Sequence, residues 1–179
     1  MEWRFAVRED RRRLPAFSCA PGRKLRRLTR RTEYATPFPW EHEIQGAVRQ
    51  LGVPLAPPRY CLVAVESDQI IAVVLYSLED SPMVIHLDLM AVAMSRRGDG
   101  GSVADDGFAE FLNRALSPIA GAVVVTVEGH IHSLNVASQR FAVRNGFTNS
   151  GEVKGAPIYG GVYERWHLTL EIVASVDES

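Results

Sequence analysis

The chain has 179 residues, of which 46% are apolar and 23% charged, which suits a globular core and argues against a disordered or collagenous protein. No apolar run reaches the roughly 20 residues of a membrane span, and the first ten residues lack a signal-peptide core. Two cysteines are too few for a disulfide framework. We therefore expect a cytoplasmic protein in a reducing setting.

The formal net charge of −1 hides an uneven distribution. Residues 1–31 hold 11 of the 20 Lys and Arg residues against three acidic residues, a net charge of +8, and the remaining chain carries −9. Clustered arginines suit phosphates, an acidic protein or an anionic surface. Few aromatic residues lie among them, so base stacking on nucleic acid has little support. We rank packing on the acidic body, or a homodimer contact, above binding to nucleic acid.

The first 39 residues contain four prolines and read as irregular, with a short strand over 3–7 and a short basic helix over 24–31. Apolar spacing and acidic first-turn residues predict a helix over 39–51, which Gly52 ends. Two β-prone runs, 60–66 and 70–78, are joined by three residues and predict an antiparallel hairpin. A third strand is predicted over 83–94, followed by a turn at 96–101.

A helix with one apolar face follows that turn and extends to residue 116. Residues 122–131 are strongly β-prone, 135–145 predict a short helix closed by Gly146, and 151–159 with 162–171 predict a closing hairpin. This order of elements predicts a mixed α/β sheet. We expect a single domain over 40–179, preceded by a basic N-terminal segment over 1–39.

The densest motif is the turn Arg96-Arg97-Gly98-Asp99-Gly100-Gly101-Ser102, between a strand and a helix. Glycines let a ligand approach the backbone, and a helix N-terminus offers free N–H groups and a partial positive charge. Arg96 or Arg97 can add a charge-assisted hydrogen bond to the same anion. The turn lacks a Walker Gly-Lys-Ser/Thr and the strand-helix-strand context of a dinucleotide fingerprint. A phosphate site and a solvated surface turn are the two interpretations.

The sequence resembles the GCN5-related N-acetyltransferase superfamily in two motifs, over roughly residues 60–170. Residues 97–102 look like its pyrophosphate loop, Arg/Gln-x-x-Gly-x-Gly/Ala, with Ser102 in the last place. Asn135-Val-Ala-Ser138 and the helix up to Gly146 look like its Asn-x-x-Ala/Ser motif, and the Ser form is similar to the branch that acetylates protein N-termini. The resemblance implies a mixed, mostly antiparallel sheet of about six or seven strands with helices on both faces.

The resemblance also implies how acetyl-CoA, the acyl donor, is held. The residues expected at its pyrophosphate are Arg96, Arg97, Gly98, Gly100, Gly101 and Ser102, and those at its pantetheine arm are Val92, Met94 and Asn135. Many members carry a general-acid tyrosine seven residues after the asparagine. Here that position is Ala142, which excludes tyrosine catalysis at that place. Ser138 is expected to hydrogen-bond the leaving thiolate instead, and Tyr159 and Tyr163 are further candidates.

Transfer to an amine needs a group that takes the ammonium proton. Alternation puts residues 84, 86, 88 and 90 on one face of the third strand, so His86 and Asp88 either line a cleft, or merely face solvent or pair with each other. Some members of the family carry a general base at these positions. Glu128, on the next strand, is another candidate, or a solvated carboxylate. His130 and His132 share a face, but we identify no further ligands and expect no metal.

The sequence thus predicts a cytoplasmic acetyl-CoA-dependent N-acetyltransferase. We expect direct transfer, in a ternary complex, to an amine of a small molecule, protein or peptide. The catalytic candidates are His86, Asp88, Glu128 and Ser138. Two alternatives stay open. One is a non-catalytic acyl-CoA-binding or regulatory module, which is favoured by the missing tyrosine and by the negative charge of Asp99, Asp105 and Asp106 at or near the glycine turn. The other is a nucleic-acid-associated protein that uses the basic arm.

Overall fold

A computed structural model describes residues 1–21, 25–28, 31–34, 39–79, 83–98, 102–119, 123–155 and 161–172. The strands are β1 Glu2–Phe5, β2 Leu25–Leu28, β3 Arg31–Tyr34, β4 Arg59–Glu66, β5 Gln69–Glu79, β6 Val84–Val92, β7 Val123–His132, β8 Thr148–Gly155 and β9 Val162–Ile172. The helices are α1 Pro39–Arg49, α2 Ser102–Leu116 and α3 Val136–Arg144, with 3-10 turns η1 Arg8–Arg12, η2 Leu14–Ala16 and η3 Met94–Arg96.

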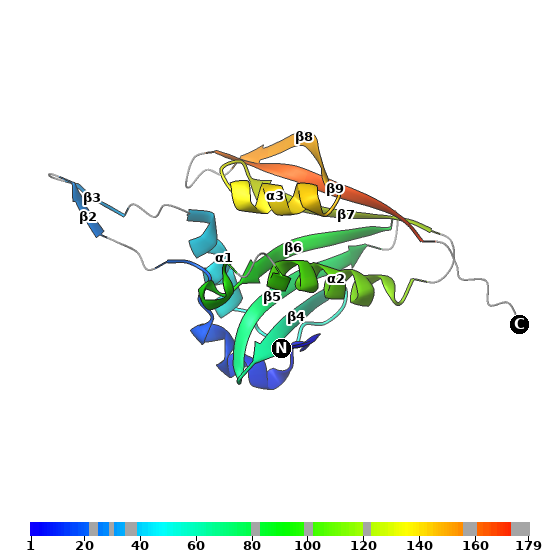
Figure 1. The fold of residues 1–179 in the computed structure, drawn as a ribbon, viewed down its shortest axis with the longest axis horizontal. Coiled ribbons are helices and arrows are strands. Elements are labelled where there is room, and N and C mark those ends of the chain that lie inside the picture. The colour runs from blue at the N-terminus through cyan, green and yellow to red at the C-terminus, as the bar shows by residue number, and fades with distance from the viewer. Residues whose placement is uncertain are drawn as a thin grey trace, which may run out of the picture.

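Seven strands form the central sheet, in the order β1-β4-β5-β6-β7-β9-β8, and the β2–β3 hairpin stands apart from it (Figure 1). The neighbours in the large sheet are antiparallel except β6 and β7, which run parallel. The mixed, mostly antiparallel sheet of about six or seven strands is therefore confirmed.

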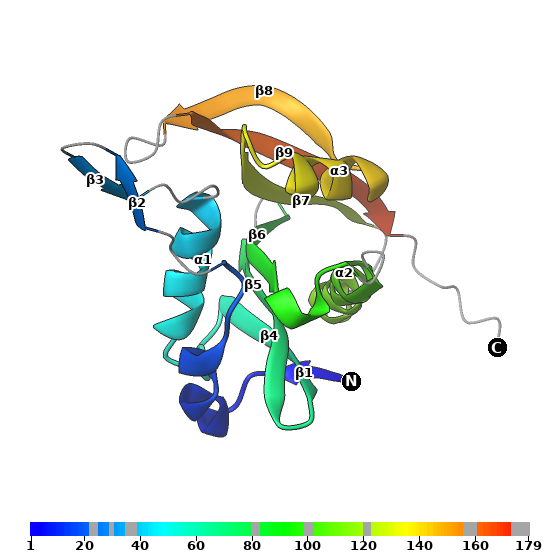
Figure 2. The ribbon, with the colours of Figure 1, turned by 60° about the vertical axis from the view of Figure 1, so that its left-hand side comes forward.

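The helices cover both faces of this sheet. Figure 2 shows α1 and α2 on opposite sides of β4 and β5, with α3 beside β7 and β9. One core cluster packs Val48 of α1 against Val63 and Val73, and the other packs Phe111 of α2 against Val74. Successive side chains of a strand point to opposite faces, so β4 and β5 bury both of their faces. This burial accounts for their nearly continuous apolar sequences.

The parallel pairing of β6 with β7 is short. Its register covers Val84–Thr126, Ile85–Val127 and ends at His86–Glu128. Against β5, the register of β6 shifts, because Leu87 and Leu89 pair with adjacent residues and Asp88 is left over between them. An extra residue bends a strand and increases its twist. The strand β6 therefore turns away from β7 just after their last shared pair.

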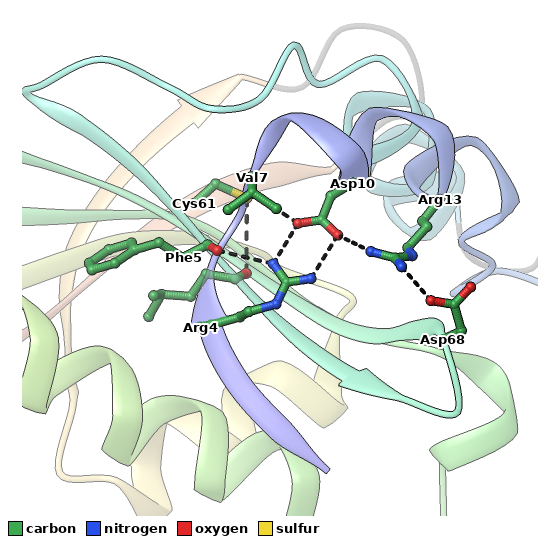
Figure 3. A network of polar contacts seen from close by, with 8 residues as sticks. Arg4, Phe5, Val7, Asp10, Arg13, Cys61 and Asp68 are labelled. Atoms are coloured by element: carbon green, nitrogen blue, oxygen red, sulfur yellow. Dashed lines mark hydrogen bonds and ion pairs between the residues drawn. The ribbon is translucent and has the colours of Figure 1, made fainter.

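The beginning of the N-terminal segment is tied to the sheet. The strand β1 pairs with β4, and the buried Asp10 accepts hydrogen bonds from Arg4 at 2.6 and 2.9 Å, from Val7 N–H at 2.9 Å and from Arg13 at 3.1 Å (Figure 3). Arg13 also pairs with Asp68 in the β4–β5 turn. These cations thus fold onto the protein itself. The division at residue 39 stays a prediction.

One predicted element is wrong. The sequence predicts a basic helix over 24–31, whereas Leu25–Leu28 is a strand paired with β3. A helix of eight residues forms too few backbone hydrogen bonds to offset the free-energy cost of its first turn. Pairing of β2 with β3 gives the backbone of both strands hydrogen-bond partners instead. The other predicted helices and strands are present within a few residues of the expected bounds.

In the described part of the chain, no helix is long and apolar enough to cross a membrane. The cytoplasmic location stays a prediction.

Candidate active site

A cavity of about 520 Å³, called the cleft below, opens where β6 and β7 part. Residues 87–92 of β6 form one wall and residues 129–132 of β7 form another. The first turn of α2 contributes Val103 and Ala104, α3 contributes Ala137 and Ser138, and α1 closes the remaining side. The cleft is therefore bounded by both halves of the sheet and by all three helices.

Five of the predicted cofactor-binding residues line this cleft, namely Val92, Arg96, Arg97, Gly98 and Asn135. Gly98 has a φ of +99°, which strains any other residue, so the turn needs a glycine there. Ser102 begins α2 at the end of the turn. Gly100 and Gly101 lie outside the described residues.

Met94 is engaged within the protein. Its N–H donates to the carbonyl of Ser18 at 2.8 Å, and its carbonyl accepts from Arg97 N–H at 3.2 Å. Its side chain is exposed and does not belong to the described lining of the cleft. The backbone of Met94 thus joins the N-terminal segment to the turn, and its contact with pantetheine stays a prediction.

Asn135 and Ser138 meet at the start of α3. The side-chain oxygen of Asn135 accepts the Ser138 N–H at 3.1 Å and caps the helix. The amide nitrogen of Asn135 is not used by this cap and can donate to a ligand. Ala142, where the family often has a tyrosine, is buried and lines the same wall as Ser138.

His86 and Glu128 lie within hydrogen-bond distance of each other at the point where the strands part. Nδ1 of His86 lies 2.7 Å from Glu128 Oε1, and its Nε2 lies 2.9 Å from Oε1 of Glu79. Glu128 is 7% exposed and also accepts from Arg165 Nε at 2.8 Å. This burial excludes the alternative of a solvated Glu128. Neither His86 nor Glu128 is among the described residues that line the cleft.

Asp88 lines the cleft at the extra position of β6. Asp88 is an exposed residue of β6, and the partial removal of water from its carboxyl group raises its pKa, although Arg59, His86 and a hydrogen bond from Ser77 oppose the rise. A carboxylate with a raised pKa on a cavity wall is a candidate proton acceptor.

The same register shift corrects one sequence expectation. Regular alternation puts Met90 on the face of His86. His86 pairs with Ser77 and Met90 with Val74, three residues apart on β5, so the two side chains point to opposite faces. The extra residue Asp88 causes the change.

Among the described residues, three arginines line the cleft, and each has a carboxylate partner. The pairs are Arg96–Glu66, Arg97–Glu41 and Arg144–Asp105. The sequence analysis missed Glu41 and Arg144 as cleft residues. In a sequence, an acidic residue in the first turn of a helix is already explained by its favourable interaction with the helix dipole. The sequence therefore gives no sign that Glu41 pairs with Arg97, 56 positions away. Arg144 stands two residues before Gly146, in the glycine–phenylalanine end of the second motif, which is a weak local signal.

Three aromatic rings, called the aromatic clasp below, join α1 to β7 and β9 beside the cleft. Trp40 stacks on His132 with a centroid distance of 4.6 Å, and Tyr163 meets His132 edge-on at 5.4 Å. The Tyr163 hydroxyl donates to Glu43 at 2.9 Å. All three rings line the cleft. The clasp therefore connects the helix on one side of the cleft to the strands on the other.

No family model and no curated relative matches the sequence. The structure is similar to nourseothricin acetyltransferase at 17% identity, with a TM-score of 0.59 and coverage of 94% of this chain and 97% of the other. It is similar to a protein described as a streptothricin acetyltransferase from Bacillus anthracis in complex with acetyl coenzyme A, at 15% identity, with a TM-score of 0.62 and coverage of 94% of this chain and 99% of the other. It is also similar to a mutant of spermidine N-acetyltransferase from Vibrio cholerae, at 12% identity, with a TM-score of 0.61 and coverage of 94% of this chain and 92% of the other.

At these identities the likeness defines the fold, which is the acyl-CoA N-acyltransferase fold that the sequence motifs imply. The finer resemblance to the Ser-bearing branch stays a prediction.

Proposed function

We propose that the protein is an acetyl-CoA-dependent N-acetyltransferase whose acceptor is a cationic amine. The observation that carries this proposal is the cleft between β6 and β7, which has Asp88 on its strand wall and the first turns of α2 and α3 on the others. Two solved structures of the same fold are named for the acetylation of nourseothricin and of spermidine, a polyamine.

The residues of the cleft fit acetyl-CoA, which would supply the acetyl group as a thioester. Its diphosphate needs hydrogen-bond donors and positive charge. Arg97, the backbone at Gly98 and the free N–H groups at the start of α2 offer both. The amide nitrogen of Asn135 would donate to the pantetheine arm. The described residues contain no group of three or more potential metal ligands, and the proposed chemistry requires none.

Asp88 would take the proton of the acceptor ammonium. The amine must lose this proton before its nitrogen bonds to the acetyl carbon and the carbon–sulfur bond breaks. A carboxylate attracts a cation, and its raised pKa makes it a stronger base than an ordinary aspartate. His86 lies two residues away and would be oriented by Glu128. We assign His86 and Glu128 positioning roles, and Ser138 a hydrogen bond to the leaving thiolate.

The charges favour a cationic acceptor over a neutral or anionic one. Asp88 and Glu41 line the cleft, and Glu43 lies beside the clasp. Residues 32–179 together carry a net charge of −9. A negative field concentrates cations near such a site. We therefore propose a di- or polyamine, or a basic peptide amine, as the acceptor.

Calorimetric titration with CoA, followed by thiol release from acetyl-CoA in the presence of spermidine, tests the proposal. We expect Asp88→Asn to bind CoA within about twofold of the wild type and to lose about 100-fold in kcat. Glu9→Gln removes an equal charge far from the cleft and should leave both values unchanged.

Absence of CoA binding would contradict the proposal. Binding without thiol release over a broad amine panel would favour the non-catalytic acyl-CoA-binding alternative instead.

A further inference from the structure

Arg97, the arginine best placed for the donor diphosphate, is bound by a carboxylate from a distant element. Its Nη1 donates to Glu41 Oε1 of α1 at 2.6 Å. The side chain of Glu41 is 16% exposed. Its second oxygen, Oε2, is buried and has no hydrogen-bond partner among the described residues. Both residues line the cleft.

A diphosphate at Arg97 would lie next to this carboxylate. The two anions repel each other, and a largely buried charge is screened less by salt than an exposed one. A guanidinium can share its donors, but the shared arrangement keeps the repulsion. The flexible glutamate side chain can leave Arg97 by a change of rotamer.

The two other ion pairs of the cleft arginines differ in one respect. Glu66 and Asp105, the partners of Arg96 and Arg144, are not among the described residues that line the cleft. Of the three carboxylates, Glu41 is the one placed to face both a bound diphosphate and the rest of the cleft.

We propose that Glu41 holds Arg97 while the cleft is empty, and that the donor diphosphate displaces it. The released carboxylate then binds the ammonium group of the cationic acceptor. Binding of the donor leaves the Glu41 carboxylate without a cation, and the acceptor ammonium supplies one. Each ligand therefore raises the affinity of the protein for the other, because such coupling is reciprocal. This inference rests on the proposed function and adds to it a residue that selects charged acceptors.

Calorimetric titration of CoA into wild type and Glu41→Gln tests the first step. We expect Glu41→Gln to bind CoA about five- to twentyfold more tightly, within the usual range of coupling between sites. Glu9→Gln is the control, because it removes an equal charge from an exposed residue that is not among the described residues lining the cleft. It should change the Kd by less than about twofold. Unchanged or weaker CoA binding by Glu41→Gln would overturn the inference.

A double-mutant cycle shows whether the effect passes through Arg97. Arg97→Gln should weaken CoA binding, and adding Glu41→Gln to it should tighten the Kd much less than Glu41→Gln does in the wild-type background. Equal tightening by Glu41→Gln in both backgrounds would assign the effect to general repulsion and overturn the inference.

The acceptor step is tested by repeating the CoA titration with spermidine present, after subtraction of a titration of spermidine into CoA alone. Spermidine should tighten CoA binding to the wild type several-fold and leave Glu41→Gln unchanged. Equal tightening in both proteins would overturn the role of Glu41 as the acceptor carboxylate. A wild type that binds no CoA would contradict the proposed function itself, whereas the other outcomes bear on Glu41 alone.

Discussion

Asp10 is a fully buried carboxylate at the junction of the N-terminal segment and the sheet. The hydrogen bond from Arg4 is the largest influence on its pKa, burial opposes it, and Val7 N–H and Arg13 lower the pKa further, to about 2. Removing one partner from such a cluster leaves buried charge uncompensated. Asp10 therefore stabilises the attachment of the first 13 residues.

Acid should remove this stabilisation. The ordinary pKa of the aspartate is 3.8, so the contribution of Asp10 is complete above about pH 4 and disappears as the pH falls through about 2. This contribution of the ionised Asp10 to the free energy of unfolding is about 2 kcal/mol. Urea unfolding should show Asp10→Asn to be less stable than wild type by about 2–4 kcal/mol at pH 6, with a smaller difference at pH 2.5. A difference that does not depend on pH would contradict the assignment.

Asp88 shifts in the opposite direction, since burial raises its pKa. A base must be ionised to act, so kcat/KM should fall on the acid side with an apparent pKa above the ordinary 3.8 of an aspartate. Steady-state kinetics from pH 4 to 9 measures this limb. It should be missing from the low residual activity of Asp88→Asn, and an unchanged limb in that variant would assign the ionisation to another group.

At the scale of elements, α2 approaches β1 through a glycine. A Cβ on Gly107 would lie 2.7 Å from Cη2 of Trp3, well inside contact distance. The indole of β1 thus occupies the space beside the helix axis. Among the described residues, and apart from the backbone of its own helix, Gly46 in α1 has no neighbour within 4 Å of the same position.

Alanine at these two sites should act in opposite directions. Alanine favours a helix over glycine by about 1 kcal/mol, so Gly46→Ala should be stabilising by up to that amount. Gly107→Ala displaces Trp3 and should cost about 1–3 kcal/mol in spite of the same preference. The free energy of unfolding in urea measures both. Equal stabilisation by the two changes would show that the Trp3 side chain can move away from residue 107 without a loss of free energy, and would contradict this account.

Periodicity predicts elements and local motifs well, and register poorly. The helical spacing of α2 and the hairpin of β4 and β5 follow from neighbouring residues alone. Arg97, Gly98 and Asn135 could be placed because each belongs to one turn or one helix cap. The extra residue Asp88 depends on how β5 pairs with β6, which no local pattern encodes. The partners of Glu41 and Glu128 likewise lie on distant segments, so sequence reasoning could not supply them.

At the scale of the whole molecule, the split between a basic beginning and an acidic remainder is partly neutralised within the fold. Arg13 of the basic beginning contacts Asp68 of the acidic remainder, and within the remainder the described arginines of the cleft are paired with carboxylates. An anionic donor therefore enters a cleft whose cations already have partners. Under the proposed exchange of ion pairs, local contacts more than net charge would control its binding.

The acidic body should make the apparent affinity for the acceptor depend on salt and on acceptor charge. Raising NaCl from 50 to 500 mM shortens the screening length from about 14 to 4 Å. The KM for spermidine should rise several-fold while kcat changes little, and the KM for a singly charged monoamine should rise less. Steady-state thiol release measures both constants. A KM that does not respond to salt would contradict electrostatic attraction of the acceptor.

Transfer of an acetyl group from coenzyme A to an amine is tested most directly by one quantitative reaction. Wild type and Asp88→Asn are incubated with acetyl-CoA and spermidine, and free thiol and acetylated amine are quantified by mass spectrometry. Wild type should form the two products in equal amounts, and Asp88→Asn should form both about 100-fold more slowly. Thiol without acetylated amine, or equal rates from both proteins, would contradict amine acetylation in this cleft.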